Sequence, residues 1–143
     1  MIGARKAKVV LSDTGPLYAL ATASDQYHEQ ARSELAHFLS EDVKLALSYS
    51  TLLETQTLLL RKMSLPFTRS FLDTLMQASY LLNPSAQDYG AAYALLAPYT
   101  DQQITWADAT LAVMSQQLGV PVWTYDRDFD ILGIQVWRPL DTL

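Results

Sequence analysis

Four acidic residues stand where a strand pattern gives way to a turn, or on the first turn of a predicted helix: Asp13, Glu54, Asp108 and Asp126. The carboxyl ends of parallel strands meet at one edge of a sheet, so we expect these side chains to converge if the strands are parallel. Two carboxylates about 4 Å apart repel by about 4 kcal/mol at an effective dielectric constant of ~20. Such a cluster either keeps protons, with raised pKa values, or holds a hard cation such as Mg2+ or Mn2+.

Carboxylate oxygens that hold Mg2+ or Mn2+ and leave waters in place are suited to phosphodiester hydrolysis. In such a site the acids supply charge and geometry, and the metal ion activates the nucleophile. Each acid also has a local structural interpretation that needs no cation. These interpretations are an Asx turn at Asp13, capping boxes that pair Glu54 with Thr51 and Asp108 with Thr105, and a helix cap at Asp126.

The composition is typical of a packed globular protein. Of the 143 residues 50% are hydrophobic and 17% are charged, so we expect one domain spanning residues 1–143. The absence of cysteine excludes thiolate metal sites and cysteine nucleophiles. No apolar run approaches the ~20 residues that cross a bilayer and no secretory signal is evident, so we expect a cytoplasmic protein with no membrane span. The net charge of -5 argues against nucleic-acid binding by charge neutralisation alone.

Short β-branched apolar runs alternate along the chain with segments in which apolar residues recur at helical spacing. We expect strands at residues 8–12, 43–48, 79–83, 120–124 and 134–137. Gly119 ends the last long helix, and the helices begin at or near Leu17, Ser24 or Asp25, Thr51, Pro66, Pro84 and Thr105. This alternation indicates an α/β fold with a mainly parallel sheet of about five strands, covered by helices on both faces.

Six short segments are specific in their order and spacing, although no single one is: 11–17 (LSDTGPL), 25–28 (DQYH) with Ala31, 51–54 (TLLE), 99–101 (YTD), 105–109 (TWADA) and 124–129 (TYDRDF). Together they resemble the PIN-domain nucleases, in particular the VapC-type toxins of VapBC toxin-antitoxin pairs. The resemblance covers nearly the whole chain. One departure is Trp106, beside the third acid, where smaller or aliphatic residues are usual in the family.

This resemblance implies a three-layer α/β/α sandwich and a Mg2+- or Mn2+-dependent endoribonuclease, the toxin of a type II pair. It implies that the metal ligands and catalytic acids are Asp13, Glu54, Asp108 and Asp126, with Asp101 as a supporting neighbour. It further implies an RNA substrate, a cognate antitoxin whose tail enters the active groove, and a homodimer.

Several other residues are weaker candidates for a functional role. Thr14 and Thr124 flank acids and could bond a carboxylate or a metal-bound water, although turn formation explains them equally well. Arg61 and Arg127 are candidates to meet RNA phosphates. Of these two, Arg61 is preferred because it lies two turns beyond Glu54 on roughly the same helical face.

Asp128 and Asp130 are interpreted as a solvated helix start, and the aromatic residues Tyr93 and Trp123 as parts of the core. Two alternative functions stay open. A phosphohydrolase of the haloacid-dehalogenase type also has an aspartate after its first strand, but it needs a second one two residues later, where this chain has Gly15. A noncatalytic interaction module with a vestigial acidic pocket would keep the fold without the reaction.

Overall fold

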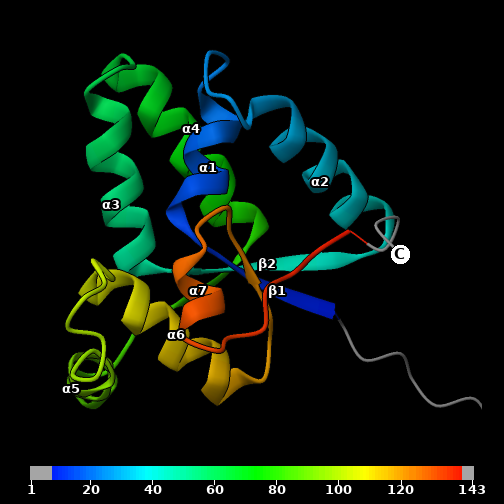
Figure 1. Cartoon of the computed structure of the whole chain (residues 1–143). Helices are drawn as coiled ribbons and strands as arrows, with labels where there is room; N and C mark the ends of the chain where they lie inside the picture. Colours follow the sequence, from blue (N-terminus) through cyan, green and yellow to red (C-terminus); the bar gives the residue numbers. More distant parts are fainter. Residues whose placement is uncertain (1–7, 140–143) are drawn as a thin grey trace, which may run out of the picture.

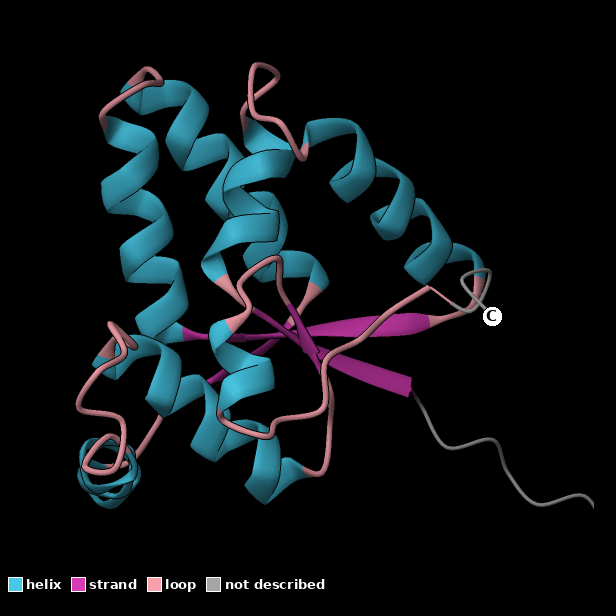
Figure 2. Ribbon diagram, in the orientation of Figure 1, coloured by secondary structure: helices cyan, strands magenta, loops and turns pink. Residues whose placement is uncertain are grey.

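The computed structural model describes residues 8–139, which form a four-stranded parallel sheet flanked by helices (Figure 2). The strands are β1 (Lys8–Ser12), β2 (Val43–Ser48), β3 (Tyr80–Leu82) and β4 (Val122–Trp123), in the spatial order β3-β2-β1-β4. Every pairing is parallel, so all four strands end at the same edge. The direction of strand addition reverses between β1 and β4. Open parallel sheets bind ligands outside the carboxyl ends of their strands at such a reversal.

Seven helices in the described part of the chain cover the two faces of the sheet (Figure 1). On one face lie α1 (Thr14–Ala21), α2 (His28–Ser40), α3 (Tyr49–Leu60) and α4 (Leu65–Ala78). On the other face lie α5 (Ala86–Leu95), α6 (Trp106–Leu118) and the short α7 (Asp128–Ile131). This is the expected three-layer arrangement. Within residues 8–139, no helix has both the length and the apolar character needed to cross a membrane.

Successive strand residues pack on opposite faces of the sheet and supply two separate cores. Val10, Leu45 and Leu47 pack with the first group of helices. Their chain neighbours Leu11 and Ala46 pack with the second group. Because side chains alternate between faces along a strand, a strand covered on both faces must be apolar nearly throughout. The runs KVVLS and VKLALS satisfy this requirement.

The expected fifth strand, at residues 134–137, is reduced to a single parallel bridge between Val122 and Val136. The neighbouring strand β4 is also shorter than expected. The Val120 N–H bonds back to the end of α6, and Pro121 has no N–H to donate, so β4 begins later than the apolar run does. The sheet therefore has four strands rather than about five.

Four helix starts differ from the expected ones, three of them because other side chains cap them. α1 begins at Thr14 rather than near Leu17, since Asp13 caps it. α3 begins earlier than expected, since the hydroxyl of Ser48 caps it in place of Thr51. α5 begins after a capping box made by Ser85 and Asp88. α2 begins without a side-chain cap, after a turn in which the Asp25 carboxylate accepts a backbone hydrogen bond.

Candidate functional site

The candidate site forms where β1 and β4 end side by side. Ser12 is paired with Trp123 in the sheet, and the Asp13 N–H donates to the Trp123 carbonyl at 2.9 Å. This register places Asp13, which follows β1, beside Thr124, which follows β4. The Thr124 hydroxyl donates to Asp13 Oδ2 at 2.8 Å and accepts from the Asp126 N–H at 2.9 Å. One threonine therefore holds two of the four predicted acids.

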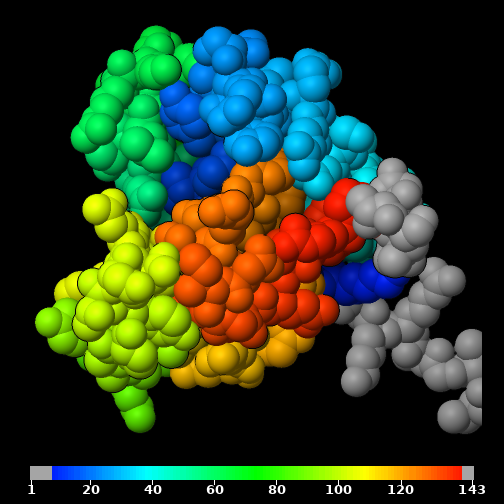
Figure 3. Space-filling model, in the orientation of Figure 1, coloured from blue at the N-terminus to red at the C-terminus, as the bar shows by residue number. Residues whose placement is uncertain are grey.

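The other two predicted acids reach the same pocket from helices. Asp108 lies on the first turn of α6, where its N–H donates to the hydroxyl of the N-cap Thr105 at 3.1 Å. Glu54 lies in α3 and is exposed at the pocket. The pocket has a volume of about 710 Å3, and its lining includes all four predicted acids. In the space-filling view, the orange segment after β4 lies between α1 and α2 in blue and the α5 region in yellow-green (Figure 3).

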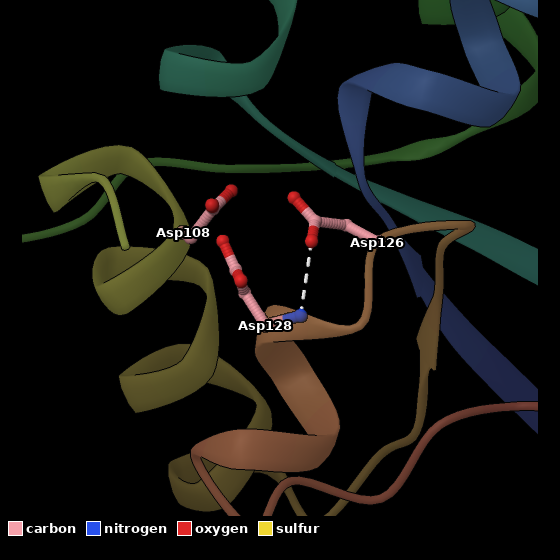
Figure 4. Close-up of side chains that lie close together, drawn as sticks. All are labelled: Asp108, Asp126 and Asp128. Atoms are coloured by element: carbon pink, nitrogen blue, oxygen red, sulfur yellow. Dashed lines mark hydrogen bonds between the residues drawn. The ribbon is translucent and has the colours of Figure 1, made fainter. Parts of the chain in front are cut away.

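Asp128, interpreted from the sequence as part of a solvated helix start, joins this cluster. One carboxylate oxygen from each of Asp108, Asp126 and Asp128 lies within 4.8 Å of the other two (Figure 4). Asp126 Oδ1 accepts from the Asp128 N–H at 2.9 Å, which turns the chain back toward the pocket. The interpretation of a solvated pair holds only for Asp130, which is exposed and forms an ion pair with Arg138 at 2.9 Å. The two-residue spacing from Asp126, within a turn, is the signal that could have identified Asp128.

Burial and mutual repulsion raise the pKa values of the clustered carboxyls. Desolvation raises the pKa of Asp13 to about 6, against the lowering effect of the hydrogen bond from Thr124. Desolvation, together with the charges of Asp13 and Asp126, raises the pKa of Asp108 to about 7. Desolvation and the charge of Asp126 also raise the pKa of Asp128. Both causes disfavour the ionised form, so the cluster holds protons more tightly than free aspartates do.

The donor set fits a hard divalent cation. Mg2+ and Mn2+ prefer oxygen ligands, and Asp108, Asp126 and Asp128 could each offer one carboxylate oxygen to a shared ion. A divalent charge would also reverse the electrostatic conditions that raise the pKa values of Asp13 and Asp108. The sequence left two outcomes open for these acids. Without a metal ion the carboxyls are expected to keep protons, and when they are ionised a bound cation would balance their charge.

Three predicted residues do not line the pocket: Asp101, Arg61 and Thr124, of which Thr124 bonds to two acids of the pocket instead. Asp101 is exposed in the loop before α6, and Arg61 is the exposed C-cap of α3. Arg61 lies about two turns beyond Glu54 at the end of the helix, and the pocket lining includes Leu58 of α3 but not Arg61. Thr14 and Arg127, by contrast, both line the pocket.

The local structural interpretations are partly correct. Asp13 is the N-cap of α1, because its Oδ1 accepts from the Thr14 N–H at 2.8 Å. Asp126 binds the backbone of Asp128, but it precedes the residue that serves as N-cap of α7. Glu54 has no capping role, because α3 begins well before it. Local structure therefore accounts for part of the placement of these acids but not for their meeting in one pocket.

The sequence matches the PIN domain family over residues 10–134, and the chain belongs to this family. A sequence comparison with curated proteins found no match.

Solved structures of VapC toxins and VapBC complexes have the same fold. VapC20 from Mycobacterium tuberculosis, described as a Sarcin-Ricin loop cleaving toxin, has a TM-score of 0.78 and 21% sequence identity, over 91% of this chain and 99% of that chain. VapBC2 from Rickettsia felis, bound to a promoter DNA fragment, has a TM-score of 0.70 and 15% identity, over 91% and 97% of the two chains. VapBC-1 from nontypeable Haemophilus influenzae has a TM-score of 0.67 and 18% identity, over 90% and 96%. The predicted PIN-like α/β fold is thereby confirmed.

Proposed function

We propose that this protein is a Mg2+- or Mn2+-dependent endoribonuclease and the toxin of a type II toxin-antitoxin pair. The observation that carries the proposal is the meeting of four carboxylates, from four separate points of the chain, in one pocket at the carboxyl edge of the sheet. Membership of the PIN domain family and the fold shared with VapC toxins support it.

In this proposal the catalytic and metal-binding acids are Asp13, Glu54, Asp108 and Asp126, and Asp128 is an additional ligand. The chemistry that a divalent ion supplies at such a site is the activation of water for attack on phosphorus and the stabilisation of the leaving oxygen. The acids would bind and orient the ion, and their separate attachment to the N-cap of α1, to α3, to α6 and to the segment after β4 fixes the geometry.

The residues around the acids orient them. Thr124 fixes Asp13 and Asp126 relative to each other through its two hydrogen bonds. The Thr14 N–H fixes the second oxygen of Asp13. Arg127, in the pocket lining, would bind an RNA phosphate next to the reacting one.

The partners follow from the same proposal. Two of the similar structures are VapBC assemblies, which supports a cognate antitoxin as the partner of this chain. We propose further that the protein forms a homodimer and acts on RNA in the cytoplasm. Co-expression with the product of an adjacent gene for a small DNA-binding protein would test the first point.

The proposal is tested by incubating the purified protein with a structured RNA and Mn2+ or Mg2+. The wild type should cut the RNA, and EDTA should stop the reaction. Asp13→Asn and Asp108→Asn should lose the activity, although an asparagine at position 13 can still cap α1. Asp73→Asn, in α4 and outside the pocket lining, should cut as the wild type does. Equal cutting by all four proteins would indicate contamination and refute the proposal.

The same assay addresses the noncatalytic alternative. If the wild type binds Mn2+ but leaves every RNA intact, the interaction module is the better description of the protein.

A further inference from the structure

A second cavity adjoins the acidic pocket and has the opposite character. Its volume is about 710 Å3, and its lining comes from the starts of α3 and α5 and from the first turns of α6. None of the described residues that line it is charged. Thr105 and Asp108 line the acidic pocket, and the two residues between them, Trp106 and Ala107, line the apolar cavity. The two cavities are therefore neighbours along the beginning of α6.

They are also neighbours along α3. Ser50 lines the apolar cavity, and Glu54, about one helical turn later, lines the acidic pocket. Adjacent turns of α3 and α6 therefore line the two cavities.

Trp106 presents a fixed aromatic surface at this place. The residue is 50% exposed, although its indole N–H donates to the Tyr89 carbonyl at 2.9 Å. Its ring meets the Tyr93 ring edge to face, with centroids 5.2 Å apart. These contacts satisfy the one polar group of the indole and restrain its ring. A group that stacks on Trp106 therefore costs little conformational entropy of this side chain. Tyr93, expected in the core, is in fact 65% exposed.

The low positive charge of the acidic pocket favours a contact with RNA that does not depend on charge. The net charge is -5, and Arg127 is the only cation among the described residues that line the acidic pocket. Within this pocket, Arg127 is therefore the one described side chain that could neutralise an RNA phosphate. Stacking of a base on an aromatic ring contributes without charge, but it requires a base that is unpaired.

We propose that the cavity beside Trp106 is a subsite for an unpaired nucleobase of the RNA substrate, which stacks on the indole while a neighbouring phosphate lies at the acidic pocket. The inference rests on the proposed function and narrows the substrate to RNA with unpaired bases beside the scissile bond. Residues of α3 and α6 contribute to both cavities, and this placement beside the acidic pocket favours RNA as the occupant over a second copy of the chain or another protein.

The test uses the full chain with Asp13→Asn, to prevent cleavage, and a fluorescently labelled RNA hairpin with an unpaired loop. Fluorescence anisotropy in Mn2+ gives its Kd. Adding Trp106→Ala should raise the Kd about tenfold, whereas Trp106→Phe should retain most of the affinity. Phe67→Ala, an exposed aromatic of α4 that lines neither cavity, is the matched control and should change nothing. A hairpin with abasic loop positions should bind weakly to the parent protein, which carries Asp13→Asn alone, and the addition of Trp106→Ala should not change its Kd.

Intrinsic fluorescence gives a second readout that does not depend on the folding of the alanine variant. Trp123 is buried and Trp137 is partly buried, so Trp106 is the most accessible of the three tryptophans, and RNA should quench the parent protein more strongly than Trp106→Phe. An unchanged Kd in the Trp106→Ala variant, together with no quenching of the parent protein by RNA, would overturn the subsite. The nuclease proposal would still stand if the wild type cuts RNA. A change of oligomeric state in Trp106→Ala with unchanged RNA affinity would overturn it in favour of a protein interface. A wild type that neither binds nor cuts RNA would refute both proposals.

Discussion

Asp13 combines a structural and an electrostatic role in one side chain. One oxygen caps α1 through the Thr14 N–H, and the other accepts from Thr124, 111 positions away in the sequence. The position of Asp13 could be predicted, because an apolar run ends there in a turn sequence. Its pKa could not, because that value depends on burial and on residues contributed by a distant part of the chain.

Asp128 and Asp130 offer a matched pair for testing the metal site. Asp128→Asn should weaken Mn2+ binding severalfold, because Asp128 contributes an oxygen to the cluster with Asp108 and Asp126. Asp130→Asn should leave Mn2+ binding unchanged, because Asp130 is paired with Arg138 at the surface, and the loss of that pair should cost at most about 1 kcal/mol. Isothermal titration with Mn2+ measures both effects. Equal affinities in the two variants would remove Asp128 from the site.

Asp108 should destabilise the metal-free fold when it is ionised. Asp108→Asn is therefore expected to be at least as stable as the wild type in EDTA at pH 8, because the substitution removes a partly buried charge that faces three others, those of Asp13, Asp126 and Asp128. Asp88→Asn should lower the Tm, because Asp88 uses both oxygens to accept bonds from Ser85 and Gln117, and an amide has one oxygen. Thermal unfolding followed by circular dichroism measures the Tm of both variants and of the wild type. A clear loss of Tm in Asp108→Asn would assign Asp108 to helix capping instead.

At the scale of the elements, the sequence predicts whether a helix or a strand forms better than it predicts the residues at which each one begins and ends. The sequence predicts both ends of α6, because Thr105 and Gly119 are strong local signals for a cap and a stop. α3 was expected to begin too late, because a strand that leads straight into a helix lets its last residue, Ser48, act as the cap. The fifth strand was overestimated, because an apolar run near a sheet does not guarantee a full ladder.

Gly119 and Gly90 should respond oppositely to the same substitution. Gly119 has φ 65° at the end of α6, so Gly119→Ala should destabilise the fold by about 1 kcal/mol. Gly90 lies inside α5 with open space around it, so Gly90→Ala should stabilise the fold by about 0.5–1 kcal/mol. Urea unfolding with a common m-value tests both. A stabilising Gly119→Ala would contradict the left-handed end of α6.

At the scale of the whole molecule, strand order rather than any single motif builds the pocket. The prediction that acids at strand ends would meet required only that the strands be parallel, and the four named acids do line one pocket. The positions of Asp101 and Arg61 could not be predicted from spacing, because loop paths and the last turn of a helix depend on tertiary contacts. Asp128 differs from these two residues, because its spacing of two residues from Asp126 within a turn is a local signal that could have identified it.

The stability of the metal-free protein should fall as the pH rises from 5.5 to 8. Asp13 and Asp108 have folded pKa values of about 6 and about 7, above their usual 3.8, so the folded state binds more protons than the unfolded state between these values. By linkage, the free energy of unfolding decreases through this window, by on the order of 1 kcal/mol or more. Urea titrations in EDTA measure it, with Asp108→Asn as a control that should show a flatter profile.

Mn2+ should offset this loss at pH 8, and saturation at 100 times the Kd would add about 2.7 kcal/mol. A metal-free stability that stays constant or rises from pH 5.5 to 8 would contradict the raised pKa values.

The most direct test of the account is a crystal structure of the wild type grown with Mn2+ at pH 7.5 or above, with anomalous scattering data collected at the manganese edge. We expect an anomalous peak at coordination distance from carboxylate oxygens of Asp108, Asp126 and Asp128, with Asp13 beside it. Carboxylates that point apart or bind only backbone amides, with no peak between them, would contradict the claim that these acids meet in order to hold a divalent ion.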